Sequence, residues 1–296
     1  MSYESKMLQW SAHVILGLFA AACLIPFALL IVSSLSSEAS IIQNGYSFFP
    51  TEFSLDAYHY LWTHAGELGR AYGITILITV VGTVVSLAIS SMLAYPLSRN
   101  DMPLRNFWTF FVFFTMLFNG GLVPTYMVYT QLFDIKNTLF GLLIPGLLMN
   151  GFNVLLVRTF FMTSIPSALI EAASIDGASE IKTFYRIVLP LSLPIMATIG
   201  LFQAIAYWND WFNGLIYLTD TRLFGIQTIL NKMMTDIQFL TSNSNLASTG
   251  AGQAIMELPS TTVRMAIAAI GVLPILIAYP FFQKYFVKGI TIGAVK

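Results

Sequence analysis

The sequence predicts an all-α polytopic membrane protein with six transmembrane helices, and three observations lead to this fold class. Hydrophobic residues make up 56% of the 296 residues and charged residues only 9%, whereas an ordinary soluble domain carries about 25% charged residues. The 14 Lys and Arg and 14 Asp and Glu residues are too few to cover a soluble protein of this length. The charges also leave six mostly apolar, uncharged stretches of 19 to 31 residues, and a spanning helix needs about 20.

Composition also excludes several classes of protein and of site. The formal net charge is zero, so the chain has no basic field to hold a nucleic acid, and we expect no nucleic-acid partner. Cys23 is the single cysteine, which excludes a disulfide framework and any cysteine-rich metal site. The three histidines, His13, His59 and His64, are too scattered to predict a metal site.

Each uncharged stretch predicts one helix. The six predicted spans are residues 11–34, 71–97, 106–130, 138–160, 194–218 and 264–285. The first stretch is too long for the apolar region of a signal peptide and lacks a small-x-small cleavage site, so we expect a retained helix. The domain prediction is an N-terminal helix at 1–34, an extracellular segment at 35–69, a transmembrane domain at 70–286 and a tail at 287–296.

Basic residues predict the orientation of these helices. Nine Lys and Arg residues fall on the side that holds the N-terminus, residues 98–105, residues 158–190 and the tail, and five fall on the other side. Cytoplasmic loops carry the excess of Lys and Arg. We therefore expect a multi-pass protein of the cell membrane with both termini in the cytoplasm.

The loop on the cytoplasmic side at 164–190 contains the most specific pattern in the chain. Pro166 suits the first turn of a helix, and residues 167–175 are expected to form a short one. Asp176-Gly177 predicts a turn with Gly177 in a left-handed cap. Ser179 can cap a second short helix, which we expect Pro190 to end.

Small residues are expected to line the exposed helical faces of this loop, where they would let a partner's backbone approach closely. These residues are Ala168, Ala172, Ala173 and Ala178. Glu171 and Asp176 can accept charge-assisted hydrogen bonds from such a partner. From the physics alone, a surface hairpin without a partner stays an alternative.

The anchors of this loop resemble the EAA loop of binding-protein-dependent ABC importer permeases. Glu171-Ala172-Ala173, three residues, Gly177, nine residues and Ile187-x-Leu189-Pro190 have the spacing of that motif. The run EAASIDGAS resembles the carbohydrate branch, akin to the maltose importer. NGGLVPTY at 119–126, WND at 208–210 and the tail KGITIGAVK resemble a subgroup that imports complex oligosaccharides in Gram-positive bacteria.

This resemblance implies a type I ABC importer permease with the MetI-like fold, in a bacterium, and a set of partners. These are a second homologous permease, two cytoplasmic ATPase subunits and an extracellular substrate-binding protein, often a lipoprotein. It implies that Glu171, Ala172, Ala173, Asp176, Gly177 and Ala178 form the coupling helix that docks on an ATPase. It also implies that Lys288 and Lys296 in the tail reach the ATPases.

The chain contains no Walker A loop and cannot bind ATP by that route. Ile181 precedes Lys182-Thr183 where a Walker A loop requires glycine, so ATP and Mg are expected only in the partner subunits. The sequence also lacks a Gly-x-Ser-x-Gly elbow and a His-Glu-x-x-His helix. We therefore predict no catalysis by this chain.

Polar residues within two predicted spans are candidates for a transport path. Asp210 lies sixteen residues after Pro194, which is about 24 Å along a helix. The path candidates are Trp208, Asn209, Asp210, Asn213, Tyr217, Asn150 and Asn153. Amides and a carboxylate can pair with sugar hydroxyls. The same residues suit an interfacial aromatic belt, contact with the other permease, or hydrogen bonding between helices.

Two backbone interruptions are also expected in these spans. Pro145 and Gly146 can kink the fourth span, and Asn119-Gly120-Gly121-Leu122-Val123-Pro124 is expected to break the outer end of the third. Other functions remain as alternatives: a permease for peptides or amino acids, or a secondary transporter. The spans contain almost no ionisable residue for an ion-coupled mechanism.

Overall fold

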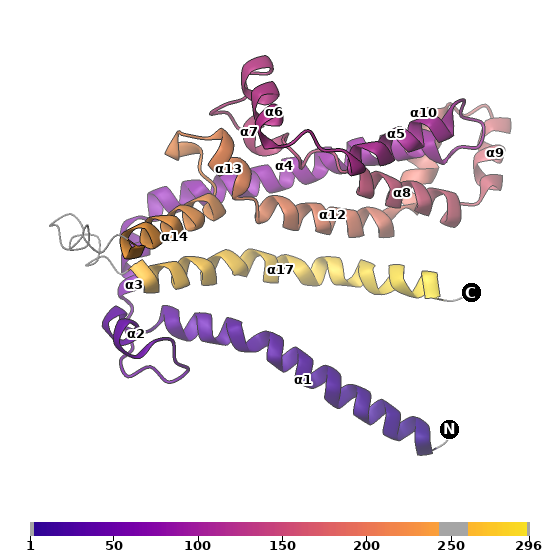
Figure 1. Ribbon diagram of the computed structural model, residues 1–296. Coiled ribbons are helices and arrows are strands. Elements are labelled where there is room, and N and C mark those ends of the chain that lie inside the picture. The colour runs from indigo at the N-terminus through magenta and orange to yellow at the C-terminus, as the bar shows by residue number, and fades with distance from the viewer. Residues whose placement is uncertain (1–2, 243–259, 295–296) are drawn as a thin grey trace. The chain divides into compact units, whose positions relative to one another are not determined.

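The computed structural model describes residues 3–242 and 260–294, and most of these residues are helical, as predicted (Figure 1). The single β pairing among them is an isolated antiparallel bridge between Ser36 and Phe53. The chain divides into two compact units, Met1–Leu68 with Leu230–Pro274, and Gly69–Ile229 with Ile275–Lys296.

The first unit contains the N-terminal helix and the segment that follows it. Its helices are α1 (Tyr3–Ser34), α2 (Glu38–Asn44), α3 (Asp56–Thr63), most of α14 (Ile226–Ser242) and the first half of α17 (Ser260–Ala294). The Glu38 carboxylate accepts the backbone N–H groups of Thr261 (3.0 Å) and Thr262 (2.8 Å). Because the first N–H groups of a helix have no partner within it, Glu38 caps the start of α17.

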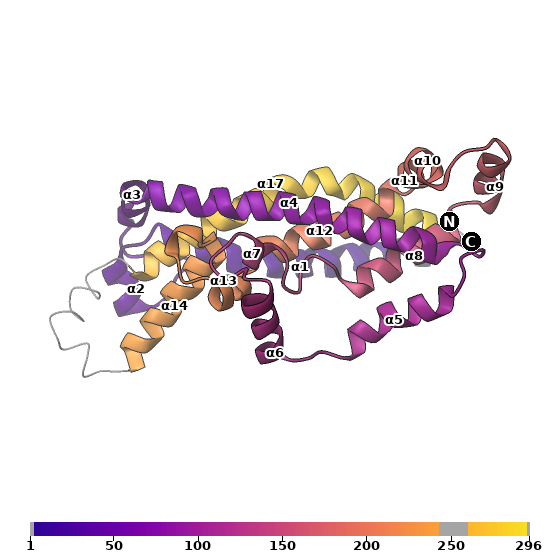
Figure 2. The same cartoon turned by 90° about the horizontal axis from the view of Figure 1, so that it is seen from above.

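The second unit contains residues 70–229 and 275–286 of the predicted transmembrane domain, including the loop at 164–190. Its helices are α4 (Ala65–Ser98), α5 (Arg105–Leu117), α6 (Leu122–Met127), η1 (Val128–Leu132), α7 (Phe140–Leu143), α8 (Gly151–Ser164), α9 (Ser167–Ile175), α10 (Glu180–Thr183), η2 (Phe184–Val188), α11 (Leu189–Leu191), α12 (Leu193–Trp208), α13 (Phe212–Tyr217), η3 (Thr221–Leu223) and the start of α14 (Ile226–Ser242). α9 and α10 lie at the end of this unit where α4 ends, and α6, α7 and α13 lie nearer its other end (Figures 1 and 2).

Three of the six predicted spans are interrupted. Two helices, Lys6–Ser34 and Ala65–Ser98, are each long and apolar enough to cross a membrane, and counting each bent pair of helices as one span raises the number to five. A shorter apolar helix covers Thr261–Ile277. The structure thus gives helices in all six predicted regions, and the number of crossings stays a prediction.

The prediction of a single helix over 138–160 is wrong. α7 ends at Leu143 and α8 begins at Gly151. Between them Pro145 has no N–H to donate, and Gly146 has a φ of 71° that a continuing helix does not allow. The prediction for 194–218 is also wrong as one helix, because residues 209–211 separate α12 from α13.

The expected break in the third span is confirmed. α5 ends at Leu117 and α6 begins at Leu122, and the chain bends by 110° between them. Gly121 has a φ of 84°, and its N–H donates to the Asn119 side chain at 2.9 Å. The polar stretch TSNSNLASTGAGQ at 241–253, whose composition predicts a flexible loop, lies almost entirely outside the described residues.

The core of the second unit joins α4, α8 and the segment after α9. Its buried side chains include Ala94, Leu97, Val154, Val157, Phe161, Phe184, Val188 and Ile199. Phe184 and Val188 belong to η2, so the second half of the predicted cytoplasmic loop packs as part of the core. Movement of that half therefore has to move α4 and α8 with it.

Candidate functional site

The segment of residues 167–191, here called the elbow, has the helix–turn–helix geometry predicted for it. α9 covers Ser167–Ile175, and Gly177 has a φ of 71°. The Ala178 N–H donates to the Ala173 carbonyl at 2.9 Å, which closes the end of α9 in the manner of a glycine cap. The Ser179 hydroxyl accepts the Lys182 N–H at 3.3 Å, so it caps α10 as expected.

The second helix of the elbow ends at Leu191, one residue after Pro190, in agreement with the prediction that Pro190 ends it. Residues 180–191 form one continuous helix in which Phe184–Val188 is π-helical. Proline in an α-helix removes one N–H and clashes with the carbonyl four residues earlier. The π-helical turn shifts the hydrogen bonding by one residue just before Pro190, and the helix then ends at Leu191.

Most residues assigned to the coupling helix are exposed. Glu171, Ala172, Asp176 and Gly177 are exposed, and Ala178 is half-buried. Ala173 is buried, which corrects the expectation that it lies on an open face. It shares the inner face of α9 with Ile170, three residues before it, as the helical period requires.

Two exposed isoleucines of the elbow were not among the predicted site residues. Ile175 at the end of α9 is 87% exposed, and Ile181 in α10 is 72% exposed. Both flank the Gly177 turn. Their position beside a turn in a loop could have identified them from the sequence, because large apolar side chains on an exposed turn are typical of a contact surface.

Polar side chains attach the elbow to the end of α4. The Tyr95 hydroxyl donates to Glu180 Oε2, and Arg99 donates to Glu180 Oε1 at 3.4 Å. Arg99 also binds Asp101 through two hydrogen bonds of 2.9 and 3.0 Å. The Arg99 guanidinium thereby lowers the pKa of the Asp101 carboxyl.

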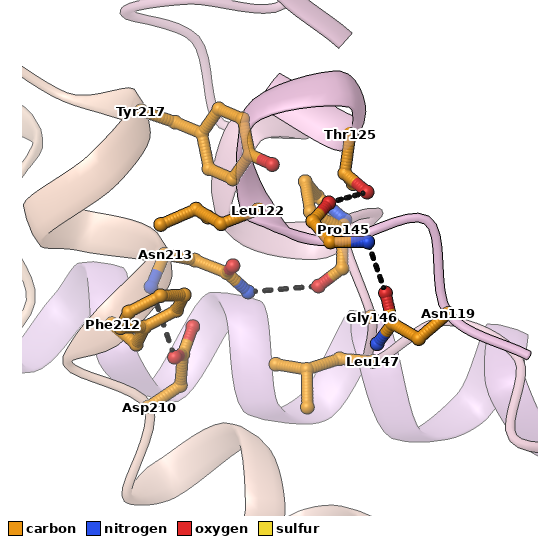
Figure 3. A pocket seen from close by; sticks show the side chains of 11 residues that line it. Asn119, Leu122, Thr125, Pro145, Gly146, Leu147, Asp210, Phe212, Asn213 and Tyr217 are labelled. Carbon is orange, nitrogen blue, oxygen red and sulfur yellow. Dashed lines mark hydrogen bonds between the residues drawn. The ribbon is translucent and has the colours of Figure 1, made fainter. Parts of the chain in front are cut away.

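A pocket lies where the three interrupted helices meet. It has a volume of about 430 Å³ and is lined by Asn119, Gly121, Leu122, Thr125, Pro145, Gly146, Leu147, Asp210, Phe212, Asn213 and Tyr217 (Figure 3). These residues come from α6 and the break before it, from the break after α7, and from α13 and the break before it. Broken helices at membrane depth are tolerated where they line a cavity or are buried in protein.

Three side chains from 203–213 hold the break after α7 in place. They donate hydrogen bonds to three alternate carbonyls, from Tyr207 to Leu143, from Asn213 to Pro145 and from Gln203 to Leu147. We call this set the carbonyl ladder. Because these carbonyls lost their helical partners at Pro145, the ladder supplies the hydrogen bonds that a continuous helix would have made.

The predicted path residues divide into two groups. Asp210, Asn213 and Tyr217 line the pocket, and Asp210 Oδ1 accepts the Asn213 N–H at 3.2 Å. Tyr217 is buried and stacks on Tyr126, with ring centroids 5.9 Å apart. These three were path candidates from the sequence, and the structure brings them together.

The other four candidates do not line the pocket. Trp208 is buried, and Asn209 is exposed and donates back to the Ile205 carbonyl. Asn153 is buried and donates to Gln203 Oε1 at 3.1 Å. Asn150, placed past the middle of a span by the sequence, instead caps α8 by accepting the Phe152 N–H. Asn150 and Asn153 are therefore structural groups beside the pocket.

The remaining predictions concern the tail and metal binding. Lys288 lies on α17, but its side chain falls outside the described part of the structure, as does Lys296 altogether. Among the described residues, no group of three or more His, Cys, Asp or Glu side chains could hold a metal ion.

Comparison with known proteins gives a family match over most of the chain. Residues 72–292 match the family described as "Binding-protein-dependent transport system inner membrane component". The match includes the elbow, the carbonyl ladder and every residue lining the pocket.

Individual relatives match over nearly the whole chain. The polygalacturonan/rhamnogalacturonan transport system permease protein YtcP of Bacillus subtilis is 36% identical over 99% of this chain and 99% of its own. Protein LplC of the same species is 40% identical over 95% of this chain and 92% of its own. A solved bacterial ABC transporter involved in import of the acidic polysaccharide alginate has a chain with 30% identity and a TM-score of 0.78, covering 97% of this chain and 99% of that one.

Proposed function

Because the chain belongs to the family of binding-protein-dependent transport system inner membrane components, and is thus a membrane-embedded permease of an ABC importer and not an enzyme, we propose that its cargo is an oligosaccharide. Relatives of this chain are named for saccharide transport. The pocket supports this cargo because amide, hydroxyl, carboxylate and aromatic groups surround one space. Such groups hydrogen-bond sugar hydroxyls and stack on the apolar faces of sugar rings.

A binding protein and an ATPase follow from the family, and the proposed assembly is more specific. One copy of this chain pairs with a second, homologous permease as a heterodimer. Two ATPase subunits, which bind ATP and Mg, contact the elbows from the cytoplasm, and a lipoprotein delivers the sugar from outside. Both termini of this chain face the cytoplasm, and the chain crosses the membrane six times.

The geometry of the elbow is the observation that carries the proposed mechanism. α9 exposes Glu171, Ala172 and Asp176, and Ile175 and Ile181 stand open on either side of the turn. The chain reaches the elbow from α8 and leaves it into α12, which bends by 79° from the second helix of the elbow. A push on α9 is transmitted to both helices and to the core that contains Phe184 and Val188.

In this mechanism, closure of the ATPases on ATP draws the elbows of the two permeases together and opens the transport path to the outside. Hydrolysis reverses the movement and opens the path to the cytoplasm. The tail residues Lys288 and Lys296 are proposed to contact the ATPases. Asp210, Asn213 and Tyr217 are proposed to contact the sugar.

Uptake by proteoliposomes tests this function. The two permeases are reconstituted with their binding protein, with or without the ATPase subunits, and labelled oligosaccharide is added with ATP inside. Uptake is expected only when the ATPases and ATP are both present. Uptake driven by an ion gradient without ATPases would indicate a secondary transporter. ATP-dependent uptake of peptides or amino acids in place of sugar would contradict the proposed cargo.

A further inference from the structure

The pocket at the three helix breaks carries a negative group and no positive one. Asp210 is its single ionisable acid, and none of the eleven residues that line it is Lys, Arg or His. The other polar side chains are the neutral groups of Asn119, Thr125, Asn213 and Tyr217. In Figure 3 the Asp210 carboxylate lies close to Asn213 at the edge of this space.

The negative charge in the pocket affects which sugars can bind there. A carboxylate accepts several hydrogen bonds, and the hydroxyls of a neutral sugar can donate to it. A uronic acid residue instead brings a second carboxylate into a partly desolvated space. Two like charges a few ångströms apart repel each other more strongly there than in bulk water.

From this arrangement we propose that the pocket accepts neutral sugar residues and discriminates against uronates through the negative charge of Asp210. The inference rests on the proposed function and narrows its substrate class to uncharged oligosaccharides. The substrate class proposed for this chain differs from that of the alginate importer, whose chain is similar in fold but whose cargo is an acidic polysaccharide. Overall similarity alone would have favoured an acidic cargo.

Asp210 also stabilises the local backbone, so the test has to remove its charge and keep its hydrogen bond. Asp210 Oδ1 accepts the Asn213 N–H at the start of α13. In Asp210→Asn an amide oxygen can accept the same hydrogen bond, because asparagine caps helices as well as aspartate does.

The chain offers a matched control for this change. Asp220 Oδ1 accepts the Arg222 N–H at 2.9 Å at the start of η3, and Asp220 does not line the pocket. Asp220→Asn therefore removes one negative charge from a capping carboxylate in the same unit, and this carboxylate also pairs with the Arg222 guanidinium at 2.9 Å. A change of net charge alone would affect both variants equally.

The substrates are trigalacturonide and its fully methyl-esterified form, which differ only in the charge of their carboxyl groups. Proteoliposomes with the complete importer and its binding protein take up each sugar, and the ratio of the two rates is measured for each variant. The binding protein is the same throughout, so its own preference cancels when the ratios are compared. Binding of both sugars to the purified importer without binding protein is measured by calorimetry.

The expected result is that the purified importer binds the ester more tightly than the acid, and that Asp210→Asn shifts both ratios toward the acid by about tenfold. Asp220→Asn should leave both ratios unchanged. Equal binding of the two forms, tighter binding of the acid, no binding of the ester at millimolar concentration, or ratios unchanged in Asp210→Asn would each overturn the inference. Loss of ATP dependence for both sugars would instead contradict the proposed function.

Discussion

The elbow and the pocket lie in the same unit of the molecule, but their backbones are fixed in different ways. The hydrogen bonds that shape the turn of the elbow join residues three to five positions apart, such as Ala178 N to Ala173 O. The carbonyl ladder of the pocket joins residues 56 to 68 positions apart. The elbow is therefore shaped by its own sequence, whereas the pocket depends on α12 and α13 lying beside the break after α7.

This difference predicts different consequences of mutation. A change at the turn of the elbow alters the direction of a surface helix and leaves the core of the unit in place. A change in the carbonyl ladder leaves buried polar groups without partners and lowers the stability of the protein. Four variants separate these effects.

Gly177→Pro should have the largest effect on transport. Proline fixes φ near −65°, whereas Gly177 requires 71°, so α9 and α10 cannot keep their relative direction. We expect uptake to fall by about 100-fold or more, with normal insertion into the membrane, because proline cannot adopt a left-handed conformation. Uptake in proteoliposomes and membrane content on immunoblots measure the two quantities.

Gly177→Asn is the control for that variant. Asparagine tolerates the left-handed region better than other residues with a side chain, and an added Cβ at Gly177 meets no atom within 4 Å. Most of the uptake should remain. Normal uptake by Gly177→Pro would show that force does not pass through this turn.

Gln203→Leu should lower stability more than any other single change in the carbonyl ladder. Gln203 is buried, donates to the Leu147 carbonyl and accepts from Asn153. Leucine leaves both partners unpaired in a buried site, which should cost about 2–3 kcal/mol. The thermal unfolding midpoint of the purified importer should fall.

The matched control is Asn209→Leu, an amide at the end of the same helix. Asn209 is exposed, and its side chain donates only to the local Ile205 carbonyl. The change in unfolding free energy should stay within about 0.5 kcal/mol. Equal loss of stability in both variants would mean that the long-range hydrogen bonds do not hold the break.

The contrast between the local hydrogen bonds of the elbow and the long-range hydrogen bonds of the pocket explains which parts of the structure the sequence predicts. α9, the Gly177 turn and the Ser179 cap follow from local turn chemistry, and the structure has all three. Pro145 and Gly146 indicate a break locally, but they do not indicate which groups satisfy the freed carbonyls. Asn150 and Asn153 illustrate this limit, because a polar residue in an apolar run looks the same whether it caps a helix or lines a path.

The misassignment of Ala173 shows what a local pattern leaves out. Ala173 was expected to be exposed because it belongs to a motif of small residues, and the direction of α9 turns it inward. Tertiary packing decided this outcome, and a local pattern contains no information about it.

Gly82→Ala should have a smaller effect than Gln203→Leu, because it shifts one member of the ladder without removing it. A Cβ at Gly82 would overlap the Tyr207 ring, whose hydroxyl donates to the Leu143 carbonyl at 2.8 Å. Overpacking of this kind costs about 1–3 kcal/mol. Gly73→Ala on the same helix adds a Cβ that meets nothing within 4 Å, and its unfolding midpoint should not fall. A stable Gly82→Ala protein would show that α4 and α12 can separate freely.

The smallest expected effect concerns the local ion pair between Arg99 and Asp101 after the end of α4, next to the Arg99–Glu180 contact that attaches the elbow. Arg99 lowers the pKa of the exposed Asp101 carboxyl. The pair therefore stabilises the folded protein at pH values above the pKa of the unfolded carboxyl, which is about 3.9. This stabilisation is lost as the pH falls through the lower pKa of the folded carboxyl. Asp101→Asn should therefore cost less than about 1 kcal/mol at pH 7, because exposed ion pairs contribute little. The difference in unfolding midpoint between the wild type and this variant should stay constant from about pH 7 to 5 and shrink below about pH 4. A loss as large as that of Gln203→Leu would mean that the elbow depends on distant side chains as much as the pocket does, since Arg99 also binds Glu180.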